Sequence, residues 1–320
     1  MKRFFPWLMA AAALGVATGV LAQGAFPDRP LKIIVGFPAG STADIVARLV
    51  AAEMSESLGQ PVVVEDRAGA GSAIAAEAVL RSPADGHTLL LSTIANTILG
   101  HVVKLSFDFE KDFAPVAVLA ETPGLLAAHP SAPATVKDLI AAAKAKPGGI
   151  AYASAGTGTV THLYGELFNL AAGVKLTHVP YKGSGQAQTD LVAGRIKLLF
   201  TPAATVVPHI KAGRLIALGS IGRTQMTVLP GVPRLVDAGV SGFESGLWFG
   251  LNAPAATPKS AIERLNQACA RALAAPEVLK RFAAQNIQAL GGTSEGFGAL
   301  IRQESEKWAR VVKSAGIKGE

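Results

Sequence analysis

The chain has 320 residues, half of them hydrophobic, and a formal net charge of +7 at pH 7. This length and apolar content suit one large or two medium domains with buried cores and argue against disorder. The basic residues are scattered without interleaved aromatics, which argues against a nucleic-acid-binding stripe, and the single cysteine, Cys269, excludes an internal disulfide.

Residues 1–22 have the layout of a secretory signal peptide. Lys2 and Arg3 form a basic start, the following run is almost wholly apolar, and small residues precede an expected cleavage site before Gln23. An uncleaved membrane anchor is the alternative, but an early proline interrupts the apolar helix and no polar stop-transfer flank follows. Cleavage removes two basic residues and no acid, so the formal charge falls from +7 to +5. The mature protein is expected to be soluble and exported.

Short apolar strands alternate with amphipathic helices over the rest of the chain. This alternation predicts α/β layers with largely parallel sheets. The predicted strands cover residues 31–35, 61–65, 88–92, 115–120, 124–128, 149–153, 176–180, 196–200, 214–221 and 247–252. The predicted helices cover residues 42–58, 70–82, 135–146, 160–172, 184–194, 205–212, 258–274, 276–285 and 294–315.

Two glycine-rich loops, at residues 37–44 and 154–159, are the most informative feature of the chain. Each follows a predicted strand and opens a predicted helix. A helix N-terminus carries free N–H groups and partial positive charge, so it attracts anions. Neither loop contains Lys or Arg, so two facing loops would form a neutral, donor-rich site for a small carboxylate.

The repeated pattern indicates two similar α/β halves with a cleft between them. A later apolar strand in each half ends in small polar residues, Ser92-Thr93 in the first half and Thr201-Pro202 in the second. Open α/β sheets bind ligands outside the carboxyl ends of their strands. The chain is predicted to divide into three parts. Residues 1–22 are the signal peptide, residues 23–122 plus 241–320 form a first α/β domain with the helical C-terminus, and residues 123–240 form a second α/β domain.

Side chains near the loops have both a structural and a functional interpretation. Ser41 and Asp44 form a capping-box pattern, and Asp44 would also shape or polarise the pocket. His162 opens the second helix, where local packing is favoured over ligand contact. Tyr181 would close the cleft with its ring and reach a ligand with its hydroxyl, and Lys182 beside it is the only cation in these loops.

No sequence motif indicates a metal or a cofactor. The histidines lack metal-ligand spacing, and the phosphate loop that ends in Gly-Lys-Ser or Gly-Lys-Thr does not occur. The segment 156–158 lacks the third glycine and the acidic partner of a dinucleotide fingerprint. The sequence therefore predicts neither a metal nor a cofactor.

Short sequence blocks between Pro27 and the C-terminus carry a family resemblance. They are residues 37–40 with Asp44 and Arg48, 64–71, 84–90, Gly156 and Gly158 with His162, Glu166-Leu167, 180–183, 189–191, 213–215 with Ala217, 230–233, Trp248 with Gly250, and Ala253-Pro254. In this order the blocks resemble the substrate-binding receptors of the tripartite tricarboxylate transporter family, the Bug-type periplasmic receptors.

This resemblance implies a two-domain α/β clamshell with a type II-like periplasmic-binding-protein fold, and no enzyme activity. It implies that a small mono- or dicarboxylate binds in the interdomain cleft and is delivered to a permease with a large and a small membrane subunit. A monomer is expected. The predicted ligand-binding residues are Phe37, Pro38, Ala39, Gly40, Ser41, Thr42, Asp44, Ser92, Thr93, Ser154, Gly156, Thr157, Gly158, Thr159, His162, Tyr181, Thr201 and Ala203.

One departure from the family pattern touches the pocket. The first loop usually carries two adjacent glycines, and Ser41 replaces the second. Its hydroxyl lies near the expected carboxylate, so the identity of the acid and the number of its carboxylates stay open.

Two other classes of protein stay open as alternatives. The first is an exported α/β enzyme, hydrolase-like, that uses His162 or Tyr181 on a small carboxylate or ester. Residues 183–185 lack the spacing of a Gly-x-Ser-x-Gly elbow, which argues against it. The second is an exported structural or adhesive module, which predicts no saturable binding of any small acid.

Overall fold

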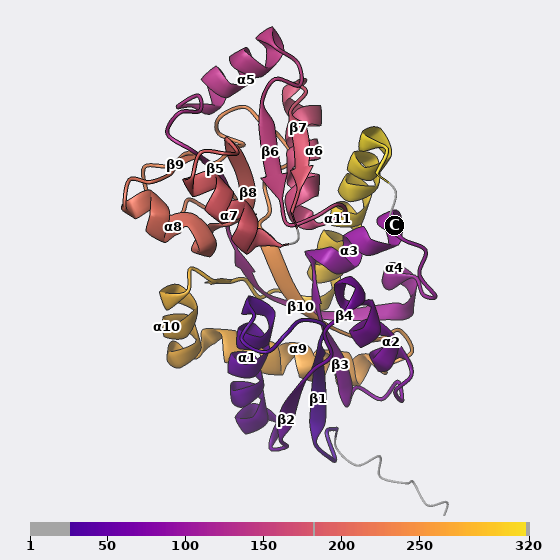
Figure 1. The fold of residues 1–320 in the computed structure, drawn as a ribbon. Coiled ribbons are helices and arrows are strands. Elements are labelled where there is room, and N and C mark those ends of the chain that lie inside the picture. The colour runs from indigo at the N-terminus through magenta and orange to yellow at the C-terminus, as the bar shows by residue number, and fades with distance from the viewer. Residues whose placement is uncertain (1–25, 182, 318–320) are drawn as a thin grey trace, which may run out of the picture.

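The computed structural model describes residues 26–181 and 183–317. The predicted signal peptide and Lys182 lie outside these residues. Figure 1 shows two α/β lobes, one above the other, with the long C-terminal helix beside their junction. In the described part of the chain, no helix combines the length and the apolar character needed to cross a membrane.

The first lobe contains a six-stranded sheet in the order β11-β4-β10-β3-β1-β2. The β1 strand is parallel to both β2 and β3, while β10 is antiparallel to β3 and β4. The strands are β1 (Leu31–Val35), β2 (Val62–Asp66), β3 (Thr88–Thr93), β4 (Phe113–Thr122), β10 (Leu247–Pro254) and β11 (Gln288–Ala289).

The second lobe contains a five-stranded sheet in the order β7-β6-β8-β5-β9. Here β6 is parallel to β7 and β8, and β5 is antiparallel to β8 and β9. The strands are β5 (Gly124–Ala128), β6 (Ala151–Ser154), β7 (Thr177–Pro180), β8 (Leu198–Pro202) and β9 (Ile216–Ile221).

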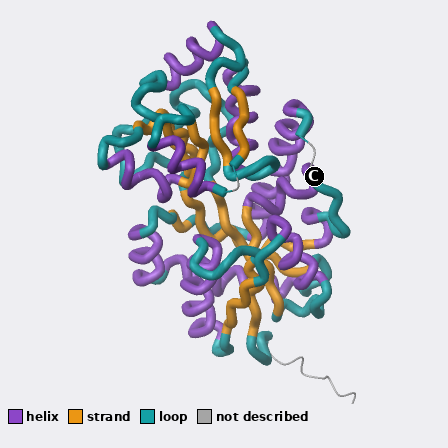
Figure 2. The backbone as a smooth tube through the Cα atoms, viewed as in Figure 1, coloured by secondary structure: helices purple, strands orange, loops and turns teal. Residues whose placement is uncertain are grey.

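The expectation of largely parallel sheets is wrong for the strands at the junction. Only Pro123 separates β4, in the first sheet, from β5, in the second, so the chain passes between lobes along an extended segment. The chain returns to the first sheet as β10, and a returning strand runs against the strand that left, which makes the pair antiparallel. Figure 2 traces these strand segments through the junction.

Most helices form where the hydrophobic pattern predicts them. They are α1 (Thr42–Leu58), α2 (Ala73–Leu80), α3 (Ile94–Val102), α4 (Phe109–Asp112), α5 (Val136–Ala145), α6 (Val160–Ala172), α7 (Ser184–Val192), α8 (Ala203–Lys211), α9 (Lys259–Ala274), α10 (Pro276–Ala284) and α11 (Ser294–Ala315). The prediction missed α3 and α4. The predicted helix 70–82 is instead a short 3-10 turn followed by α2, because Gly71 and Ser72 adopt positive φ angles of 62° and 82°.

Helices α1 and α9 pack together on one face of the six-stranded sheet, in a core that includes Val50 and Leu265. Cys269 is fully buried in this core, with its sulfur 3.8 Å from that of Met54, as expected for a small apolar residue. Helix α11 contacts both α3 and α6, so it packs against both lobes. The exact domain limits at 122/123 and 240/241 stay a prediction.

Candidate functional site

A cavity of about 180 Å³ lies where helices α1, α3 and α6 begin. Helices α1 and α3 follow parallel strands of the first sheet, while α6 follows a strand of the second, so the cavity lies between the lobes. Its lining residues are Phe37, Ser41, Thr42, Ala43, Thr93, Ile94, Ala95, Val160, Leu247, Trp248 and Phe249. The predicted residues Phe37, Ser41, Thr42 and Thr93 are among them, and residues 38–40 lie exposed in the same loop.

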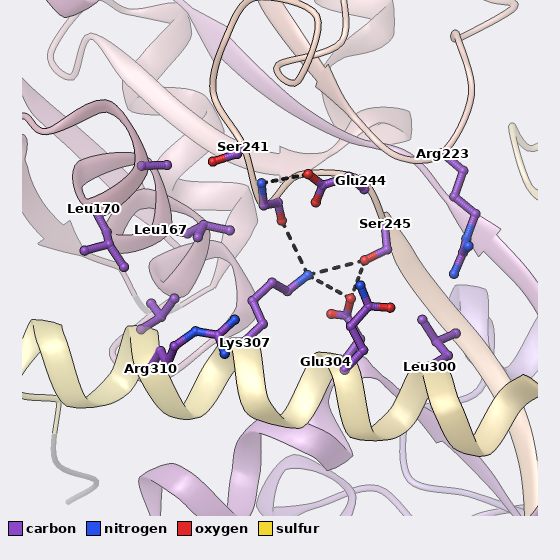
Figure 3. Close-up of a pocket in the computed structure, with 14 residues that line it drawn as sticks. Leu167, Leu170, Arg223, Ser241, Glu244, Ser245, Leu300, Glu304, Lys307 and Arg310 are labelled. Carbon is purple, nitrogen blue, oxygen red and sulfur yellow. Dashed lines mark hydrogen bonds and ion pairs between the residues drawn. The ribbon is translucent and has the colours of Figure 1, made fainter.

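A larger cavity of about 410 Å³ lies at the other end of α6, between α6, α11 and residues 241–245 (Figure 3). It is lined by the ion-paired side chains of Glu304 and Lys307 and by none of the predicted ligand-binding residues. We therefore take the smaller cavity as the candidate site.

The loop before α1 is built by its own side chains. Ser41 caps the helix by accepting a hydrogen bond from the Asp44 amide at 3.3 Å, and Asp44 Oδ2 accepts one from the Gly40 amide at 2.8 Å. The buried Asp44 also pairs with Arg48 Nε at 2.6 Å, and Arg48 pairs with Asp66 at 2.9 Å. Asp44 therefore positions the loop. A reciprocal capping box would require its carboxylate to accept a hydrogen bond from the Ser41 amide, but the carboxylate accepts one from the Gly40 amide instead.

The sequence predicted Thr93 as a ligand-binding residue but missed the helix that it caps, α3. Thr93 Oγ1 accepts a hydrogen bond from the Ala95 amide at 3.2 Å, and Asn96 Oδ1 accepts one from the Thr93 amide at 2.8 Å. The sequence does contain a signal for this helix, because Asn96 follows Thr93 at the spacing of a capping box, with Asn in place of Glu or Gln. Ser92 faces elsewhere: it is fully buried and donates to Asn252 Oδ1 at 2.5 Å, which joins β3 to β10.

The hydroxyls of Ser154 and Thr159 are engaged with groups of their own loop and with His178 of β7. Ser154 Oγ accepts a hydrogen bond from the Gly156 amide at 3.0 Å and lies 2.7 Å from His178 Nε2. Thr159 caps α6 and donates to the Gly156 carbonyl at 2.7 Å. Gly156 and Gly158 have φ angles of 135° and 76°, which favour glycine. The predicted residues 154 and 156–159 do not line the cavity, whereas Val160, which directly follows them, does.

The His162 side chain holds the second loop through a hydrogen bond. The ring is buried, and its Nδ1 accepts a hydrogen bond from the Gly158 amide at 3.0 Å. It stacks on the ring of His178 with 3.8 Å between centroids, and its Nε2 lies 3.9 Å from Glu166 Oε1. Burial lowers the pKa of both histidines to about 4, so both rings are neutral at pH 7. These contacts fit the local structural role that the sequence favoured.

These two histidines predict acid sensitivity. Because each folded-state pKa lies near 4 and the ordinary value is 6.5, the unfolded chain binds more protons between these values. The free energy of unfolding is therefore expected to be highest above pH 6.5 and to fall progressively down to about pH 4, by at most about 3 kcal/mol per histidine. Urea unfolding between pH 7.5 and pH 4.5 measures this slope. A slope unchanged in a His162→Gln/His178→Gln variant contradicts the assignment.

The remaining predicted residues lie in the second lobe, away from the cavity lining. The Tyr181 hydroxyl donates to Asp190 Oδ2 at 3.0 Å. Thr201 Oγ1 is 2.9 Å from Thr205 Oγ1, and the Ala203 amide donates to the Pro123 carbonyl at 2.9 Å. Among the cavity residues, sequence reasoning missed Ala43, Ile94, Ala95, Val160, Leu247, Trp248 and Phe249.

Two α/β lobes joined by extended segments, with helix starts from both lobes at a cavity between them, define the class of periplasmic solute-binding proteins. Comparison with known proteins supports this class. Residues 46–317 match the model of the tripartite tricarboxylate transporter family receptor. The chain belongs to this family, and it is a solute-binding receptor, not an enzyme. The predicted two-domain clamshell fold is confirmed.

Relatives match over nearly the whole chain. BugT of Bordetella pertussis is 36% identical over 311 residues, which cover 96% of this chain and 95% of BugT. The structure of R. palustris Rpa4515 with adipate is 33% identical with a TM-score of 0.75, covering 92% of this chain and 100% of that one. The structure of MatC from Rhodopseudomonas palustris with bound malate is 32% identical with a TM-score of 0.71, covering 90% and 100%.

Proposed function

We propose that this receptor captures a small organic mono- or dicarboxylate between its lobes in the periplasm and delivers it to a tripartite transporter with large and small membrane subunits. The observation that carries the proposal is the meeting of the α1, α3 and α6 starts at one cavity. Relatives with bound adipate and malate support a carboxylate as the ligand. The receptor acts as a monomer and needs no cofactor.

Free amides at the helix starts supply the binding energy in this proposal. Ser41 caps the amide of Asp44, which leaves those of Thr42 and Ala43, at the first positions of α1, for the ligand. Each hydrogen bond contributes about 1 kcal/mol, and more to a charged acceptor. A handful of such bonds, with bridging waters, reaches the roughly 8 kcal/mol of micromolar affinity.

Closure of the lobes completes the site. The ligand stabilises the closed state because it gains contacts there that the open state lacks. We propose that domain 123–240 turns on domain 23–122 plus 241–320 and brings amides of residues 156–159 to the carboxylate. Its Tyr181, Thr201 and Ala203 then border the closed cleft, in line with their predicted roles.

A thermal-shift screen of the purified receptor against organic acids, malate and adipate included, tests the proposal. At least one acid is expected to raise Tm in a saturable way, because only the folded state binds it. Loss of uptake of that acid by cells that lack the receptor tests delivery to the transporter. A flat response to every acid at millimolar concentration contradicts capture.

A further inference from the structure

The cavity combines one group of hydrogen-bond donors with an apolar wall. The donors lie at the helix starts, where the amides of Thr42 and Ala43, among the lining residues, are left free by the Ser41 cap. The remaining wall is made by side chains without hydrogen-bonding groups, namely Phe37, Ile94, Val160, Leu247 and Phe249. The ring of Trp248, between the last two, packs on Phe297 on the opposite face of β10. Such a wall favours a hydrocarbon over a polar group.

The polar side chains of the lining are largely committed to the protein itself. The hydroxyls of Ser41 and Thr93 accept hydrogen bonds from amides of their own helices. In the part of the chain that the structure describes, no charged side chain lines the cavity. Arg48 follows the first loop, but Asp44 and Asp66 already pair with it. As the structure describes it, the cavity therefore offers donors for one carboxylate at the helix starts and no second set opposite them. The amides of residues 156–159 that closure adds bind that same carboxylate in the proposed function.

The apolar wall belongs to the site because of how β10 is paired. Leu247 and Phe249 are two residues apart in β10, so their side chains share one face of the strand. Phe249 lies directly opposite Thr93, the cap of α3, in the antiparallel pair of β10 and β3. The hydrocarbon surface thus begins beside a helix start, within the length of one small acid.

We infer that this receptor selects a monocarboxylate with an apolar body and disfavours dicarboxylates of the same length; the inference rests on the proposed function. The carboxylate sits at the helix starts, and the hydrocarbon body packs on Leu247 and Phe249. A second carboxylate would lose its water against this wall without gaining a partner, which is strongly unfavourable for an ionised group.

Isothermal titration of the full-length mature receptor with hexanoate and with adipate tests this selection. The two acids have equal carbon chains and differ by one carboxylate, and adipate is the acid bound in a relative. Hexanoate is expected to bind at least tenfold more tightly. Equal or tighter binding of adipate overturns the inference and leaves the proposed function intact. Failure of both acids, together with the whole acid panel, overturns both.

A second test of this selection places a positive charge on the apolar wall, at Leu247. Leu247 is half-buried at the start of β10, so Leu247→Arg can present a guanidinium to the cavity, and Leu247→Gln is the uncharged control. Leu247→Arg is expected to shift the hexanoate-to-adipate ratio at least tenfold toward adipate, while Leu247→Gln weakens hexanoate without favouring adipate. Melting of each variant without ligand shows whether it is folded. A ratio that stays the same in a folded Leu247→Arg variant overturns the inference.

Discussion

Thr42→Glu is expected to reduce the affinity for the organic acid at least 100-fold, about 3 kcal/mol, without lowering Tm. Thr42 is half-buried, lines the cavity and is the first residue of α1. A carboxylate there occupies the place of the ligand's own charge, and two like charges about 4 Å apart repel by about 4 kcal/mol at an effective dielectric constant near 20. The helix itself tolerates the change, because an acidic side chain in the first turn stabilises a helix by about 0.3–1 kcal/mol.

Thr42→Gln is the matched control for this prediction. Glutamine has nearly the size of glutamate and no charge, so it shows the steric part of the effect alone. Titration calorimetry and thermal melting of both variants separate affinity from stability. If glutamate and glutamine weaken binding equally, the charge of the ligand is not held at the start of α1, and the proposed carboxylate position is wrong.

Glu304→Ala is expected to lower the free energy of unfolding by about 3–5 kcal/mol. Glu304 is 2% exposed on α11 and accepts hydrogen bonds from Ser245 Oγ at 2.5 Å, Lys307 Nζ at 2.8 Å and Trp308 Nε1 at 3.0 Å. Figure 3 shows Glu304 and Lys307 converging on Ser245, which lies in the segment that returns from the second lobe. Without the carboxylate, the mostly buried ammonium group of Lys307 loses its counter-charge and the buried indole N–H of Trp308 loses its acceptor. This loss is more costly than that of one surface ion pair.

Glu306→Ala offers a control on the same helix. Glu306 is exposed, so its loss is expected to change stability by less than about 0.5 kcal/mol. Denaturant unfolding followed by circular dichroism gives both values. Equal losses in the two variants contradict the structural role of the Glu304 cluster.

Local sequence signals predicted the first loop well. Residues 31–35 and 42–58 form the strand and helix that hydrophobic pattern and capping residues indicate, and Ser41 caps the helix as expected. These signals act over a few residues, so they can be read in one dimension. At Thr93 the sequence predicts only the end of a strand and not the start of a helix, because α3 follows β3 without any loop.

The second loop was predicted in place but not in orientation. Ser154 and Thr159 look like ligand donors in the sequence, yet their hydroxyls bond to groups of the loop and to His178. Nothing in the local pattern links Ser154 to a histidine that lies 24 residues away on the neighbouring strand. The predicted roles of these residues as ligand contacts stay a proposal that depends on closure.

By itself, the sequence determined the alternation of strands and helices, the two glycine loops and the family, because caps, glycines and apolar periodicity act between near neighbours. Only the tertiary structure decided which helix starts meet and what faces them. Phe249 comes to lie opposite Thr93 through pairing of β10 with β3, strands joined elsewhere by the hydrogen bond of Ser92 to Asn252 across 160 residues. Contacts over such separations arise from the packing of whole sheets, which no local pattern encodes.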